Sequence, residues 1–173
     1  MTMIHKSILN LIMMAMVTLL FFPSSEKRIS MYHKPLQEKH LPKVSEFVSG
    51  IQQQNPGIRF KSGKMVRKSH YQYVNFDKGG MQVFSAGDIV QMINIIVIEE
   101  KQALVKQNFP VNIFKLLNKY ISAEVSVWFN KSLEEISVSK KNNDARIFKL
   151  KLYKMTVGYN TQTGSLIVTI QAH

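Results

Sequence analysis

The sequence predicts an α+β fold: an antiparallel sheet of about five or six strands with two or three packed helices, preceded by an N-terminal hydrophobic signal or anchor segment. Three observations lead to this prediction. An apolar run fills residues 8–22, several later segments repeat apolar residues at the spacing of a helix, and the C-terminal third alternates apolar and polar residues as a half-buried strand does. Ten Phe, six Tyr and one Trp supply the apolar surface that a packed core needs.

Residues 1–25 have the pattern of a segment that enters a membrane. A basic tip precedes the apolar run, which only Asn10 and Thr18 interrupt, and small residues follow it. This order is typical of a signal peptide. A spanning helix needs about 20 apolar residues, and the run is shorter, so a cleaved signal is the first expectation. An anchor formed by residues 4–22 and a buried core helix remain as alternatives.

Residues 26–42 are predicted to be a basic linker, because polar and basic residues dominate and prolines interrupt any apolar period. Residues 43–173 are expected to form a single α+β domain, since their number fits one domain. The chain contains no cysteine, which excludes a disulfide framework and a thiolate metal site. An exported domain without disulfides fits bacterial export better than eukaryotic secretion.

The first half of this domain is predicted to hold a helix and a hairpin. Apolar residues recur at helical spacing in residues 42–54, and a proline opens the segment. Residues 58–76 are rich in strand formers. A turn signal at residues 77–80 then leads to a partner strand at residues 81–84, so we expect a β-hairpin.

Residues 86–107 are ambiguous. Their apolar residues fall on a helical stripe with Gln91 and Asn94 on a polar side, whereas the β-branched run at residues 95–98 is typical of a strand. We take the helix as the prediction. A second helix is expected in residues 110–122, whose apolar residues share one face.

The C-terminal third is predicted to be antiparallel sheet. Alternation assigns residues 124–130 to a strand, and residues 148–159 to one long strand whose apolar period slips by one position. Such a slip moves later side chains to the opposite face, so we expect a bulge or sharp bend near residues 152–154. A turn at residues 160–164 then leads to a closing strand at residues 166–170.

The charge balance points to an anionic partner. The chain has a formal net charge of +12, and a positive potential concentrates anions near a surface. Outside a cell these are anionic lipid, acidic glycans and wall polymers, and other envelope proteins are further candidates. Nucleic acid is the least favoured partner because the export signal argues against it. A basic surface that only confers solubility is the alternative.

One basic and aromatic stretch supplies the candidate ligand-binding or polyanion-binding residues, namely Arg59, Lys61, Lys64, Arg67, Lys68, Tyr71 and Tyr73. Cations of this kind pair with phosphate or carboxylate, and rings stack or lie at an interface. Strand alternation divides the set between two faces. The alternative is that these lysines lie on a solvent-exposed edge strand and prevent it from pairing with other chains, which gives the same pattern. A second basic stripe, formed by Lys149, Lys151 and Lys154, would strengthen the polyanion hypothesis if it lay beside the first.

Trp128 is a candidate contact for a partner protein. In the strand predicted for residues 124–130, Val125, Val127 and Phe129 share one face and Trp128 lies on the other. An outward-facing tryptophan often marks a binding surface. A helix that packs over that face is the alternative.

No catalytic residue, metal ligand or cofactor is predicted. The five histidines lack metal-binding spacing, adjacent glutamates point apart on a helix or strand, and nucleophile-elbow and phosphate-loop motifs do not occur. The hypothesis of a small hydrolase requires that folding gather Glu100, His70 or Tyr73 into one site. Such a site is an alternative because catalytic groups can come from distant positions in the sequence.

Together these observations favour an exported, non-enzymatic binding or assembly module of the bacterial cell envelope with a basic surface, located in the periplasm or outside the cell. A secreted effector that acts on anionic membranes is the alternative; it needs the same charge and an exposed apolar surface. The small hydrolase ranks third.

Overall fold

The computed structural model describes residues 41–63, 69–106, 109 and 112–173. The predicted signal or anchor segment at residues 1–25 and nearly all of the predicted linker lie outside these ranges. Within the described ranges, no helix has the length and apolar character needed to cross a membrane.

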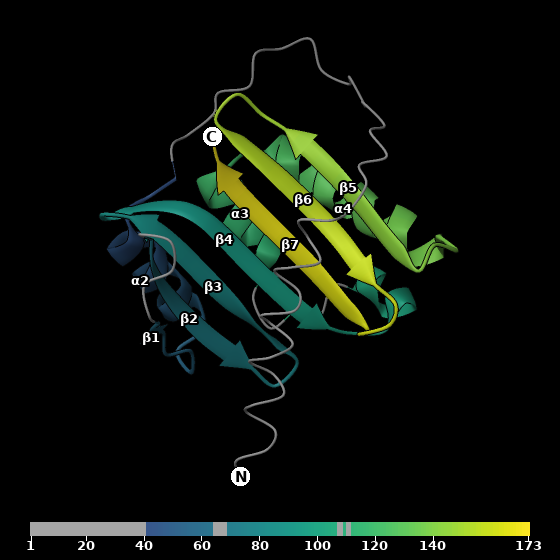
Figure 1. Ribbon diagram of the computed structural model, residues 1–173, viewed down its shortest axis with the longest axis horizontal. Helices are drawn as coiled ribbons and strands as arrows, with labels where there is room; N and C mark the ends of the chain where they lie inside the picture. Colours follow the sequence, from purple (N-terminus) through teal and green to yellow (C-terminus); the bar gives the residue numbers. More distant parts are fainter. Residues whose placement is uncertain (1–40, 64–68, 107–108, 110–111) are drawn as a thin grey trace.

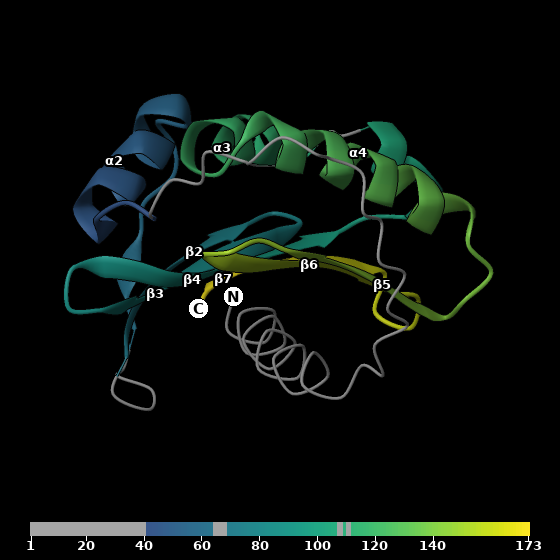
Figure 2. The same cartoon turned by 90° about the horizontal axis from the view of Figure 1, so that it is seen from above.

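The described residues form one antiparallel sheet that helices cover on one side. In chain order the elements are α2 (Val44–Gln54), β1 (Lys61–Ser62), β2 (His70–Phe76), β3 (Gly79–Ala86), β4 (Ile89–Ile98), the 3-10 helix η1 (Lys101–Lys106), α3 (Ile113–Tyr120), α4 (Ala123–Val138), β5 (Asn143–Lys149), β6 (Tyr153–Asn160) and β7 (Ser165–Ala172). The strand order is β1-β2-β3-β4-β7-β6-β5 (Figure 1). Helices α2, α3 and α4 all lie on the same side of this sheet (Figure 2). We call that side the helix face and the opposite side the open face.

The α+β class is confirmed, with a sheet of seven strands rather than five or six. The helix predicted for residues 42–54 is confirmed as α2, the hairpin as β2 and β3, and the helix in residues 110–122 as the shorter α3.

The helix predicted for residues 86–107 is wrong, because Ile89–Ile98 forms strand β4. This strand lies in the middle of the sheet, between β3 and β7. Ile93, Ile95 and Val97 point to the core on the helix face, and Ile96 is buried on the open face. A strand whose two faces are both apolar has no alternation, so its period cannot be distinguished from that of a buried helix.

The strand predicted for residues 124–130 is also wrong, because this segment is the first half of helix α4. The helix begins after Ser122, whose hydroxyl accepts a hydrogen bond from the Val125 amide at 3.3 Å, as a helix N-cap does. Val125, Phe129 and Leu133 then recur every four residues and are fully buried. The short alternation in residues 124–130 therefore led to a wrong prediction of a strand. The helical repeat becomes clear only when residues beyond 130 are included.

The single long strand predicted for residues 148–159 is two strands joined by a tight turn. Lys149 of β5 pairs with Lys154 of β6, and the Leu150 amide donates to the Tyr153 carbonyl at 2.8 Å. The slip in apolar period near residues 152–154 thus marks a reversal of the chain, not a bulge within one strand. A register irregularity occurs elsewhere, between Phe84 and Ser85 in the pairing of β3 with β4.

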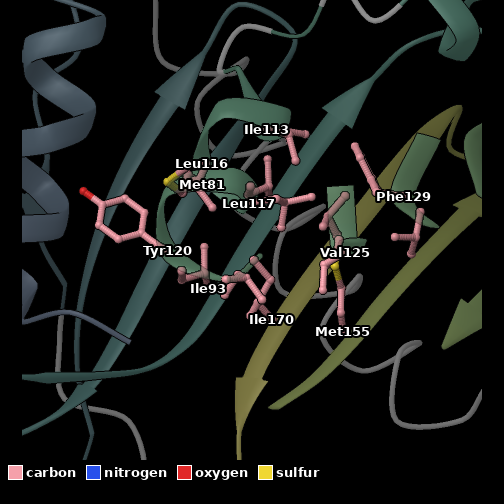
Figure 3. Close-up of a cluster of buried hydrophobic side chains, with 14 of the residues drawn as sticks. Met81, Ile93, Ile113, Leu116, Leu117, Tyr120, Val125, Phe129, Met155 and Ile170 are labelled. Atoms are coloured by element: carbon pink, nitrogen blue, oxygen red, sulfur yellow. The ribbon is translucent and has the colours of Figure 1, made fainter. Parts of the chain in front are cut away.

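The core lies between the sheet and the helices (Figure 3). Leu117 of α3 and Phe129 of α4 meet Met81, Ile93 and other apolar side chains of the central strands. These residues are fully or almost fully buried, and at about 25 cal/mol per Å² such burial is the dominant favourable contribution to folding.

An ionic network joins α4 to the edge strand β5. The Arg146 guanidinium pairs with the carboxylate of Asp144 on its own strand and with Glu135 of α4, whose Oε2 lies 3.0 Å from Arg146 Nε. Asp144 is buried, which would raise its pKa. Hydrogen bonds to Arg146 and Ser139, together with the nearby positive charges of Arg146 and Lys141, outweigh burial and hold the pKa below its usual value.

Asp144→Asn is expected to reduce stability at neutral pH by about 1–3 kcal/mol, the range for a lost hydrogen bond to a charged group. A carboxylate whose pKa is lowered by folding stabilises the fold above its unfolded pKa, about 3.9. It loses that contribution as pH falls through the folded pKa. The unfolding free energies of wild type and variant should therefore differ at pH 7 and converge as the pH falls through the lowered folded pKa of Asp144. Urea titrations across this range measure the difference, and a gap that persisted at the lowest pH would contradict the assigned role.

Candidate functional site

The open face presents one continuous row of side chains across all seven strands. Directly opposed residues on antiparallel strands point to the same face, and successive pairings link the members of the row, which are Lys61, Tyr73, Gln82, Asn94, Thr169, Thr156 and Ile147. We call this set the central row. It begins and ends at the two edge strands and is polar in the middle.

Three neighbouring members of the central row carry buried oxygens without a hydrogen-bond partner. They are Gln82 Oε1, Asn94 Oδ1 and Thr169 Oγ1, on the adjacent strands β3, β4 and β7. Native proteins leave few buried polar atoms unpaired, because each costs about 1–3 kcal/mol. Three such acceptors therefore lie side by side in the middle of the central row.

Aromatic rings border the central row near the β1 edge. Tyr71 stacks on Phe84 with ring centroids 5.3 Å apart, and Tyr73 lies 6.0 Å from Tyr71. Gly63 lies beneath the Tyr71 ring, where a Cβ atom would overlap the ring. The absence of a side chain at Gly63 therefore allows the Tyr71 ring to lie flat against the edge strand.

The predicted basic stretch is only partly described. Lys61 is exposed in β1, and its partner Tyr73 shares its face. Arg59 is exposed in the loop after α2, where its Nη1 donates to the Pro56 carbonyl at 2.6 Å. The other three cations of the stretch, Lys64, Arg67 and Lys68, lie outside the described residues. The structure thus places Lys61, Tyr71 and Tyr73 on the open face and holds the Arg59 guanidinium against its own loop.

The second basic stripe does not lie beside the first. Lys149 and Lys154 are paired on β5 and β6, at the opposite edge of the sheet from β1. Lys61 and Lys154 both face the open side, and five strand spacings separate them, roughly 24 Å. The lysines therefore flank the open face at two edges and do not form one patch.

Trp128 lies on the helix side of the molecule. It is half-buried on α4, and its ring packs against that of Phe148 at a centroid distance of 5.1 Å. The prediction that Trp128 points outward from a strand is wrong, because the segment is helical. The exposed apolar residue of this segment is Val127, which is 63% exposed. Trp128 therefore takes no part in the open face.

The three residues considered for a hydrolase site, Glu100, His70 and Tyr73, do not lie together. His70 and Tyr73 are three positions apart on β2 and so point to opposite faces, while Glu100 is exposed beyond the end of β4. Among the described residues, no three His, Asp or Glu side chains are grouped in a way that could hold a metal ion.

Sequence reasoning missed the polar members of the central row. One signal was present: Asn94 is a polar residue within the otherwise apolar Ile93–Ile98 part of β4. Its alignment with Gln82 depends on the register of the β3–β4 pair, and its alignment with Thr169 depends on the pairing of β4 with β7, which is distant in the sequence. Compared with known proteins, the chain matches no family model, no curated protein and no solved structure.

Proposed function

We propose that this protein is an exported, non-enzymatic binding or assembly module of the bacterial cell envelope, and that the open face of its sheet is the binding surface. The observation that carries the proposal is the arrangement of two lysines, Lys61 on β1 and Lys154 on β6, which face the open side with the polar middle of the central row between their strands. The positive net charge and the N-terminal apolar run support an anionic partner beyond the membrane.

The spacing of the lysines favours an extended ligand. A small anion reaches one edge only, because Lys61 and Lys154 are roughly 24 Å apart across five strand spacings. A polymer with repeated acidic groups, or an array of anionic lipid headgroups, engages both edges at once.

A pair of double variants tests this surface. Lys61→Gln with Lys154→Gln removes one charge from each side of the open face, on β1 and on β6. We expect binding to phosphatidylglycerol vesicles at low salt to weaken roughly thirtyfold, since each lysine near an anionic surface contributes about 1 kcal/mol. Vesicle co-sedimentation measures the affinity, and an acidic wall polymer serves as a second probe.

Lys131→Gln with Lys140→Gln is the matched control. Both residues are exposed, on α4 and just after it, and the change in net charge is the same. We expect the control pair to weaken binding much less than the open-face pair. Equal losses would show that total charge alone drives binding, and unchanged binding in both pairs would contradict the polyanion proposal.

A further inference from the structure

The outward side of helix α4 carries one stripe of exposed residues. Its members are Ala123, Val127, Lys131, Glu134 and Val138. Successive residues turn by about 100° around a helix, so the stripe lies on the opposite side of α4 from Phe129 and Ile136, which are fully buried. The stripe therefore points away from the sheet, on the outer surface of the helix layer (Figure 2).

Two members of the stripe are exposed valines. Val127 and Val138 are 63% and 81% exposed, and they are two of the four large apolar residues that are exposed among the described residues. A β-branched residue also has a lower helix propensity than most residues. A helix side that faces only water gains nothing from these valines, whereas a helix side that contacts another protein buries them.

The order of residues along the stripe is self-complementary. Positions 127, 131, 134 and 138 follow the alternating spacing of four and three residues that forms the seam of a coiled coil. Two copies of α4 can pack antiparallel about a two-fold axis that passes between residues 132 and 133. Val127 of one copy then lies level with Val138 of the second copy. In the two central layers, Lys131 lies level with Glu134 of the second copy.

We propose that two copies of this chain associate through this stripe, as an antiparallel pair of α4 helices. Charge complementarity determines both the partner and the direction, because each Lys131 meets a Glu134. A parallel pair would bring Lys131 beside Lys131 and Glu134 beside Glu134, and like charges disfavour such an interface. Asn130 donates to Oε1 of Glu134 at 2.9 Å, and a carboxylate accepts up to about four hydrogen bonds. Glu134 can therefore also bind a lysine of the second copy.

The two ends of α4 are complementary as well. Antiparallel packing brings the first turn of one α4, which carries Glu124, towards the C-terminal end of the other helix. Lys140 and Lys141 follow that end, and both are exposed. A negative charge near a helix N-terminus and positive charges near a C-terminus also suit the two helix dipoles.

The pairing fixes where the two open faces lie. Helix α4 is on the helix face of the sheet (Figure 2), so the two open faces form the opposite outer sides of the dimer and point apart. One dimer can then join two anionic surfaces or polymers, a consequence that rests on the proposed function. An interface of one helix per copy is smaller than a standard protein interface, so the monomer predominates at low micromolar concentration.

Cysteine crosslinking tests the register of this contact. The chain has no cysteine, so a full-length chain with Val127→Cys or Val138→Cys has a single thiol. We expect oxidation of a mixture of the two variants to give a dimer in which residue 127 is joined to residue 138. Each variant alone should give about tenfold less product, because its two thiols are roughly 17 Å apart along the helix pair, too far for a disulfide.

Charge exchange in the mixed cysteine variants tests what holds the two copies together. Lys131→Glu in both chains places like charges at the two central layers, and we expect the crosslinked yield to fall about tenfold. Adding Glu134→Lys to both chains makes the charges opposite again and should restore the yield. Lys43→Glu changes the net charge by the same amount at an exposed position just before α2. This matched control should leave the yield unchanged.

Three results would overturn the proposal. Equal yields from the single variants and from the mixture would show association without a register. Equal effects of Lys43→Glu and Lys131→Glu would show that net charge alone controls it. The third is the absence of any product up to about 500 µM protein, which covers the range of weak association. A single vesicle surface engages only one open face of a dimer, so the vesicle assay of the lysine variants can fail or succeed separately.

Discussion

Gly79→Ala is expected to lower the free energy of unfolding by about 3–5 kcal/mol, which combines backbone strain with a steric clash. Gly79 opens β3 with φ of +139°, a backbone conformation that L side chains rarely adopt. A Cβ atom there would also overlap the carbonyl oxygen of Ile96 on β4. The clash is with backbone of a central strand, so it cannot be relieved by a change of rotamer.

Gly87→Ala is the matched control for this variant. Gly87 also has a positive φ, +58°, but its added Cβ would meet nothing within 4 Å. We expect a loss of about 1 kcal/mol from the strained backbone alone. Urea unfolding followed by circular dichroism measures both variants. Similar losses at the two positions would contradict the close approach of β3 to β4 at Gly79.

Phe129→Ala is expected to cost about 3–5 kcal/mol, the usual loss for a fully buried aromatic side chain. Phe129 is completely buried, and its ring lies 6.5 Å from that of Phe109. Its removal leaves a cavity between α4 and the sheet. The matched variant Val127→Ala is expected to change stability by less than about 0.5 kcal/mol, because Val127 is largely exposed.

This pair also tests the secondary structure of the segment. Residues 127 and 129 lie on the same face of a strand but about 200° apart around a helix, at 3.6 residues per turn. A large loss at Phe129 with almost none at Val127 supports helix α4. Comparable losses at both positions would favour the strand that alternation alone predicts. Chemical denaturation of both variants in parallel decides between the two.

The errors in predicting the fold have one physical origin. Local patterns report which residues are buried, whereas the choice between helix and strand at β4 and α4 is made by tertiary packing. In β4, burial on both faces removed the alternation that marks a strand. In α4, Ser126 and Ser132 are buried polar residues on the core side, and they obscure the helical apolar stripe.

The candidate site was harder to predict than the fold. The sequence alone indicated Lys61, Tyr71 and Tyr73 as binding residues, and the structure places these three on the open face. The central acceptors could not be grouped from sequence. Asn94 and Thr169 are 75 positions apart (169 − 94), and only the register of β4 against β7 makes them neighbours.

The position of β7 in the sheet has a consequence for how the protein is made. Strand β4 ends at residue 98 and its partner β7 ends at residue 172, so 74 residues (172 − 98) separate the two. A ribosome that adds about 5–20 residues per second needs roughly 4–15 s for this stretch. Throughout that interval the nascent chain carries β4 as an unpaired apolar edge, which other chains can join. A chaperone that binds this strand during synthesis would prevent such aggregation.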